Sequence, residues 1–375
     1  MAVPRTRPLR APLVLLMALL WLVLALPTTT PAHAYAHPKP NRTATPTHSV
    51  SPTHSTSPGV QEPAVAPPAV PHEHAGVRPL TVAAKVAGFL GMTVFVGGLA
   101  FLALLWPDGT WHHRVRRVLV TAWAAGAGAS LVGIGLQGLQ NDMRPLSEVF
   151  KPDVLGGVLT EHLGEVWAVK GLLWVLAAVV LAWALRAGDQ AVRHAPWRVA
   201  ALAVGFGLLR TTGMTGHASG TPRPALSQAA DLLHLTGVSL WFGGLVMLLA
   251  GVVQRHRAGE LARVMPRYSM LALGSVLAIA ASGLVLAWQL VGSFDGLVTT
   301  SYGRLLLGKL AVFALVLAAA QRSKKWVAER LDLAVLLRGD AVTVRPLLYS
   351  VAAETALLSV VLLAASLLVT AAPGR

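Results

Sequence analysis

The sequence predicts an all-α polytopic membrane protein with eight transmembrane helices, preceded by a signal peptide and a disordered tail. Hydrophobic residues make up 54% of the 375 residues, charged residues only 13%, and the mean hydropathy is +0.61. A soluble domain carries about 25% charged residues. Several apolar segments are long enough to cross a bilayer. The basic residues gather in alternate loops between these segments, as they do in membrane proteins.

The N-terminus has the features of a secretory signal peptide, which we expect over residues 1–34. Three arginines precede an apolar run from Ala11 to about Leu26, and small residues follow at Ala34 and Ala36. A basic head, a short apolar stretch and an A-x-A site are typical of a cleaved signal. An uncleaved anchor is the alternative.

Residues 35–77 are rich in Pro, Thr, Ser and His and lack the apolar residues of a core. We expect a disordered extracytoplasmic tail here. Cleavage after Ala34 makes His37 the third residue, and cleavage after Ala36 makes it the first. In either position a terminal amine and an imidazole can chelate Cu(II) or Ni(II). The alternative is a simple tether without metal.

Eight apolar segments follow, and only helices satisfy the backbone of lipid-exposed segments. Four of them belong to a first half, residues 78–215, and four to a second half, residues 216–375. They lie near 80–106, 118–138, 164–185, 197–214, 226–252, 267–291, 302–321 and 346–371.

The loops predict the orientation of these spans. One alternate set of loops holds sixteen Arg and Lys residues, and the other set holds four. The positive-inside rule puts the first set in the cytoplasm. We therefore expect both the mature N-terminus and the C-terminus on the outer side of the membrane.

Two glycine motifs suggest an internal duplication. Residues 95–99 read Phe-Val-Gly-Gly-Leu, and residues 241–245 read Trp-Phe-Gly-Gly-Leu. Ser130 and Ser282 occupy similar places in the following spans. A parallel 4+4 repeat is one explanation. The other is that paired glycines let helices approach closely.

Polar residues inside the membrane are costly and point to function. Asp231 and His234 are three residues apart, so they share a helix face. Met214 and His217 precede them across a short loop. Imidazole and thioether groups suit copper, and sulfur favours Cu(I). We expect Met214, His217 and His234 to bind the metal and Asp231 to orient the imidazole of His234.

The same residues allow an interpretation without metal. A histidine at a helix end is often solvated or hydrogen-bonded. Lys170, Arg210 and Lys309 could reach outward to water or pair with acidic groups such as Asp231. Three basic residues around a cation site are also electrostatically unfavourable, which the sequence leaves unexplained.

Several motifs stand out over about residues 200–373. They are Gly216-His217-Ala218, the run from Asp231 to Leu245, Arg267-Tyr268-Ser269, Ser282-Gly283, Thr300 to Lys309, and Arg345 with Glu354. Together these motifs resemble the CopD family of bacterial copper-resistance membrane proteins. The resemblance implies copper homeostasis in the bacterial cytoplasmic (plasma) membrane, with copper moved towards the cytoplasm, and an extracytoplasmic CopC-like copper-binding protein as partner.

Residues beyond the metal ligands are expected to line or shape the pathway. They share a position within the membrane or a place in the family motifs. Besides Asp231 they are Trp241, Gly243, Gly244, Tyr302, Lys309 and Glu354.

Other function classes are weaker. Residues 303–310 nearly spell a phosphate-binding loop but lack its final Ser or Thr and begin a membrane helix, so we expect no nucleotide. The chain has no cysteine, and its net charge of +15 follows topology instead of nucleic-acid binding. We predict no enzyme activity. Two alternatives stay open: a haem b electron-transfer protein using His162, His217 and His234, and a copper sensor or assembly factor without transport.

Overall fold

The computed structural model describes residues 77–142, 146–160, 164–214, 223–252, 258–291 and 294–299, with parts of 303–321. Within these ranges every regular element is helical. The predicted signal peptide, the tail with His37 and the last predicted span lie outside the described residues. The predicted seventh span is described only in part.

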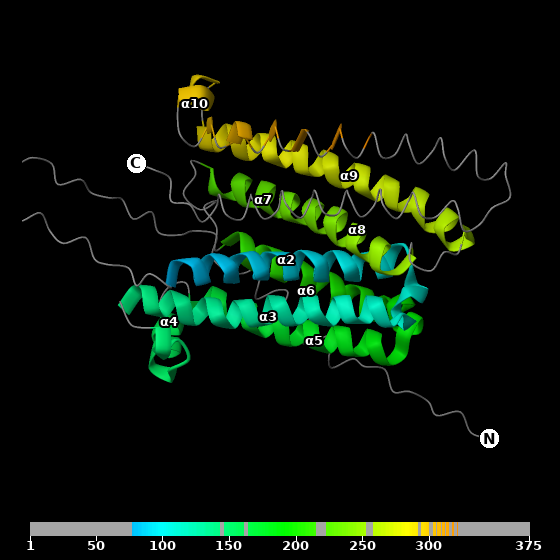
Figure 1. Cartoon of the computed structure of the whole chain (residues 1–375), viewed down its shortest axis with the longest axis horizontal. Helices are drawn as coiled ribbons and strands as arrows, with labels where there is room; N and C mark the ends of the chain where they lie inside the picture. The colour runs from blue at the N-terminus through cyan, green and yellow to red at the C-terminus, as the bar shows by residue number, and fades with distance from the viewer. Residues whose placement is uncertain are drawn as a thin grey trace, which may run out of the picture.

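The long helices run side by side in one bundle (Figure 1). Short helices connect them or continue them. In chain order the elements are α2 (Val77–Leu104), η1 (Pro107–Trp111), α3 (His113–Asp142), η2 (Leu146–Glu148), α4 (Pro152–Thr160), α5 (Gly164–Arg193), α6 (Ala195–Met214), α7 (Pro224–Val238), η4 (Ser239–Gly243), α8 (Gly244–Met247), η5 (Leu248–Val252), α9 (Ala258–Val291) and α10 (Phe294–Thr299).

Five stretches of helix in the described ranges are long and apolar enough to cross a membrane. They are Pro79–Leu104, His113–Leu139, Gly164–Arg193, Pro224–Val252 and Arg263–Gln289. Each overlaps one predicted span, and α3, α5 and α9 extend beyond the predicted bounds. The predicted span at 197–214 is also a helix, α6, but α6 is not among these five.

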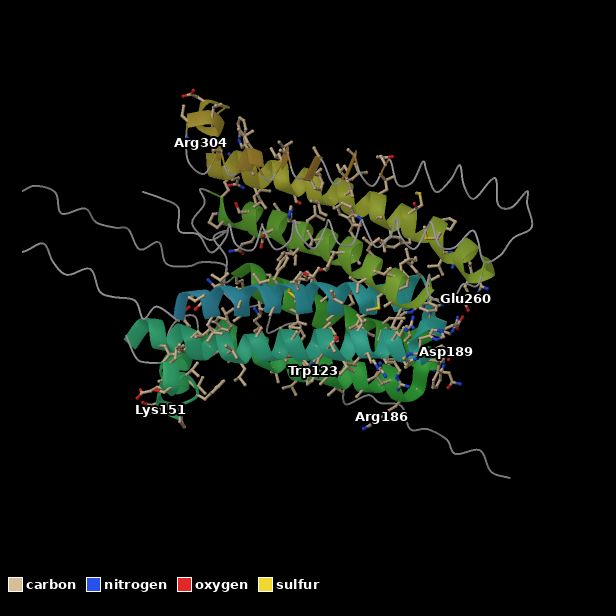
Figure 2. The ribbon with its side chains drawn as sticks, in the orientation of Figure 1. Trp123, Lys151, Arg186, Asp189, Glu260 and Arg304 are labelled. Atoms are coloured by element: carbon tan, nitrogen blue, oxygen red, sulfur yellow. The ribbon has the colours of Figure 1, made fainter. Side chains whose placement is uncertain are left out.

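Described residues in or next to loops of the two predicted sets lie at opposite ends of the bundle. Figure 2 shows Lys151 and Arg304 at one end and Arg186, Asp189 and Glu260 at the other. This arrangement agrees with the alternation read from the basic residues. Which end faces the cytoplasm stays a prediction.

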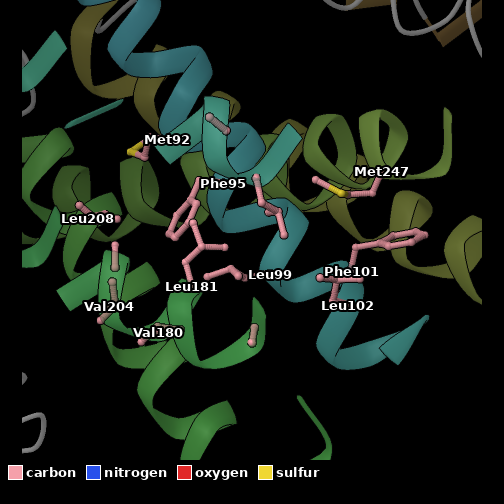
Figure 3. Close-up of a cluster of buried hydrophobic side chains, with 14 of the residues drawn as sticks. Met92, Phe95, Leu99, Phe101, Leu102, Val180, Leu181, Val204, Leu208 and Met247 are labelled. Atoms are coloured by element: carbon pink, nitrogen blue, oxygen red, sulfur yellow. The ribbon is translucent and has the colours of Figure 1, made fainter. Parts of the chain in front are cut away.

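The bundle core is apolar and centres on α2. Met92, Phe95 and Leu102 are at most 2% exposed, and they belong to one buried cluster with Leu181 of α5 and Leu208 of α6 (Figure 3). The outward surfaces are also apolar, as expected where lipid replaces water. Leu202 and Leu284, for example, are each 73% exposed.

The two glycine motifs meet where α2 crosses η4. A Cβ on Gly97 would clash with the backbone carbonyl of Ser239, and a Cβ on Gly243 would lie 2.7 Å from the Gly97 Cα. The paired glycines therefore serve close helix packing here. The internal repeat stays a prediction.

The end of the bundle that carries Asp189 is tied together by side chains. The Trp111 indole donates to Asp189 Oδ1 at 2.9 Å, and Arg193 donates to Asp108 Oδ1 at 2.8 Å. Gly188 has a φ of 58° and lies against the Trp111 ring. Glycine adopts this φ without strain, so α5 can bend at Gly188. The Trp111 ring of η1 packs against this bend.

Candidate metal centre

His234 lies in the bundle with a defined ring orientation. It is part-buried on α7, and its Nδ1 lies 3.2 Å from Ser282 Oγ on α9. The Ser282 hydroxyl lies 2.6 Å from the Ala278 carbonyl, to which it donates. Because the single hydroxyl hydrogen of Ser282 is used in that bond, Ser282 Oγ accepts from the Nδ1–H of His234. The acceptor lone pair of the His234 ring is then on Nε2.

A glycine on α7 allows this contact. A Cβ on Gly237 would lie 2.9 Å from the Ser275 carbonyl of α9. Glycine at this position therefore lets the two helices approach closely enough for a direct imidazole–hydroxyl bond. Next to Ser282, a Cβ on Gly283 would lie 3.7 Å from His234 Cε1, which is ordinary van der Waals contact.

Asp231, one turn before His234, lies towards α6. It lines a narrow crevice with Arg210, Gly213 and Gln228. A Cβ on Gly213 would lie 2.5 Å from Asp231 Oδ2. Ser282 thus contacts the His234 ring, and the role expected of Asp231 in orienting that ring stays a prediction. The Asp231 carboxylate lies on the neighbouring face of α7.

The other expected metal ligands are described only in part. Met214 ends α6 and packs part-buried against the core. His217, Tyr302, Lys309 and Glu354 lie outside the described residues, as does His162. No group of three His, Asp or Glu side chains placed for a metal occurs in the part of the chain that the structure describes.

Lys170 and Arg210, two of the basic residues expected near the site, have identifiable partners. The Lys170 ammonium lies 5.4 Å from the centre of the Trp167 ring, on the same helix. Arg210 donates to Gln228 Oε1 at 2.9 Å. Both partners are uncharged, so the two basic residues keep their positive charge near the candidate site.

Trp241, Gly243 and Gly244 lie about two helical turns or more beyond His234 in the same helical run. Trp241 is 4% exposed, and its carbonyl accepts a hydrogen bond of 2.7 Å from the Tyr268 hydroxyl. Its ring meets Phe313 at a centroid distance of 6.4 Å. A Cβ on Gly244 would lie 2.6 Å from the Tyr268 ring. The segment 239–243 is a π-helix, a form frequent at functional sites.

The sequence analysis did not identify a polar stripe along one face of α9. Tyr268, Ser275, Ser282 and Gln289 are spaced by seven residues, so they share one face. The first three are at most 5% exposed, and the Gln289 amide nitrogen is buried without a hydrogen-bond partner among the described residues. The opposite face holds exposed apolar residues such as Met270 and Leu284. The seven-residue spacing was the signal that could have found it.

Two family models match the chain. Residues 76–222 match the model described as copper resistance protein D-like, N-terminal domain. Residues 262–368 match the model described as copper resistance protein D. The chain therefore belongs to the copper resistance protein D family of membrane proteins.

Two curated relatives are similar to the chain. The copper transport protein CutJ of Bacillus subtilis is 31% identical over 254 residues, which are 65% of this chain and 46% of the relative. The copper resistance protein D of Pseudomonas syringae pv. tomato is 32% identical over 205 residues, 52% of this chain and 64% of the relative. The chain thus spans about half to under two thirds of the length of these relatives. No solved structure matches.

Proposed function

We propose that this protein binds copper near the end of the bundle where α7 begins and moves it across the bacterial cytoplasmic membrane, towards the cytoplasm. The observation that carries the proposal is the His234–Ser282 bond beside Asp231. In metal sites the ligating histidine is usually held in this way, through a hydrogen bond from its other ring nitrogen. Both matched families and both relatives are named for copper.

The chemistry of the residues suits copper. His234 offers Nε2 as the ligand nitrogen, and Met214 and His217 would complete the site with a thioether and a second imidazole. Asp231 would offset the cation's charge, which is costly inside a membrane. Before copper reaches this site, it would be captured outside the membrane by the tail residue His37 or by a CopC-like partner.

The route inward would follow the seam between α7 and α9. Consecutive members of the α9 stripe are about 10.5 Å apart along the helix axis. Tyr268 contacts Trp241 and Gly244 at the level of the π-helix. We assign Trp241, Gly243 and Gly244 to shaping this route, and Tyr302, Lys309 and Glu354 to its remaining walls.

Metal analysis and a visible spectrum of the detergent-purified protein test the proposal. We expect bound copper and no Soret band. His234→Ala should weaken copper binding by more than the roughly 10- to 100-fold typical of losing a group that orients a ligand. His194→Ala is the matched control, because His194 is exposed between α5 and α6, at the opposite end.

Copper uptake into vesicles separates transport from sensing. We expect uptake by the wild-type protein and by His194→Ala, and loss of uptake in His234→Ala. Copper binding without uptake would leave a sensor or assembly factor. A Soret band with no copper would overturn the proposal in favour of haem.

A further inference from the structure

The crevice beside the candidate metal centre contains two opposite charges. Arg210 comes from α6 and Asp231 from α7. The lining residues are Leu209, Arg210, Gly213, Gln228, Asp231 and Leu232. His234 is one turn beyond Asp231 on the same helix. Any cation held by His234 therefore shares the field of both charged groups.

The guanidinium of Arg210 is bound to Gln228 and not to the acid. Its Nη2 donates to Gln228 Oε1 at 2.9 Å. In the described part of the chain, the ion pairs within 4.0 Å join Lys151 to Glu148 and Arg193 to Asp108 and Asp189. Arg210 and Asp231 face the same crevice without forming such a pair.

Gln228 is placed to hold this arrangement. It lies three residues before Asp231, so both side chains project from one face of α7. Arginine presents five donors and would bind a carboxylate with two parallel bonds if it reached one. A neutral amide one turn away is a weaker acceptor. The position of Arg210 on Gln228 therefore leaves Asp231 open to another cation.

We propose that Arg210 is a resident cation that competes with copper for Asp231, and that its bond to Gln228 holds it off the carboxylate. The inference rests on the proposed function. Without copper, Arg210 in the same crevice offsets the charge of Asp231, so that no isolated carboxylate remains inside the membrane. Gly213 lets the Asp231 carboxylate lie directly against α6, the helix that carries Arg210, since a Cβ there would lie 2.5 Å from Asp231 Oδ2.

The test is a double-mutant cycle on the full chain, with Cu(I) affinity measured by competition against a chromophoric chelator. Arg210→Gln removes the competing charge and should tighten binding by at least about tenfold. Gln228→Leu releases Arg210 onto Asp231 and should weaken binding by about tenfold. In the combined variant the effect of Gln228→Leu should vanish, which a purely structural role of Gln228 would not produce.

Two controls keep the outcomes distinct. Arg210→Lys retains the charge and should not tighten binding. Thermal unfolding in detergent reports whether each variant is folded. Copper binding by the wild-type protein with unchanged or weaker binding in folded Arg210→Gln overturns this inference alone. A wild-type protein that binds no copper overturns the proposed function and this inference together. This inference alone is also overturned if Gln228→Leu weakens copper binding equally in the wild-type background and in the Arg210→Gln background.

Discussion

Ser282→Ala is the sharpest test of how the metal centre is built. The substitution removes the oxygen that accepts from His234 Nδ1–H at 3.2 Å, and it changes the volume of the side chain only slightly. The hydroxyl also donates to the Ala278 carbonyl at 2.6 Å, but that carbonyl already belongs to the helical backbone of α9. The main loss is therefore the orientation and tautomer of the His234 ring.

The expected size follows from one hydrogen bond. A neutral bond of this kind contributes about 1 kcal/mol net, and about 1.4 kcal/mol corresponds to a tenfold change in affinity. The ring can also turn or take the other tautomer, and losing a group that orients a metal-bound histidine typically costs about 10- to 100-fold in affinity. We therefore expect Ser282→Ala to weaken copper binding by about tenfold without abolishing it.

Ser130→Ala is the matched control. Ser130 on α3 is also buried, donates to the carbonyl four residues earlier at 2.8 Å, and accepts from the Trp174 ring nitrogen at 3.0 Å. It lies in the other half of the chain and away from His234.

The assay is Cu(I) competition on purified protein, with thermal unfolding measured in parallel. Similar loss of stability in both serine variants, with loss of copper affinity only in Ser282→Ala, is the expected result. Equal copper affinity in both variants would refute the assigned role of Ser282.

The remaining predictions concern packing and are checked by thermal unfolding in detergent. Gly97→Ala should destabilise the protein by about 1–3 kcal/mol because its methyl group would meet the backbone of η4, whereas Gly128→Ala, with nothing within 4 Å, should be neutral or stabilising. Gly188→Ala should cost more than 1 kcal/mol or so because its φ is 58°, while Gly171→Ala serves as the unstrained control. Tyr268→Phe should cost about 1 kcal/mol through the lost bond to the π-helix carbonyl, and copper uptake should slow if this contact shapes the route. Unchanged stability of Gly97→Ala or of Gly188→Ala would contradict the packing described above.

Composition predicted the helical membrane fold because bilayer thickness sets the length of each apolar segment. The described helices overlap their predicted ranges, and the largest differences lie at the ends, where α3, α5 and α9 extend past the predicted hydrocarbon core. The bounds could not be read more closely, since helices continue beyond the lipid wherever capping and packing allow. Helix α6 illustrates the limit of hydropathy: it forms over its predicted range, yet it is not one of the five described stretches that are long and apolar enough to cross a membrane.

Sequence spacing placed Asp231 and His234 on one helix, but it could not identify partners on other helices. Ser282, which holds the His234 ring, is 48 residues away, and Arg210 is 18 residues from Gln228. Such pairs depend on which faces meet in the folded bundle. In a membrane the apolar face of a helix can point outward, so the polar spacing on α9 marked its buried face more clearly than the apolar residues did.

The candidate centre depends on both matched regions of the chain. Arg210, Gly213 and Met214 lie within residues 76–222, which match the N-terminal family model, and Ser282 lies within residues 262–368, which match the other. His234 and Asp231 stand on α7, between the two matches, and α7 packs against both α6 and α9. A shift of α9 against α6 would therefore change the orientation of His234 and the position of Arg210 relative to Asp231 at the same time. Such coupling would serve the proposed transport, because a movement of α9 against α6 would then release copper from the residues that bound it.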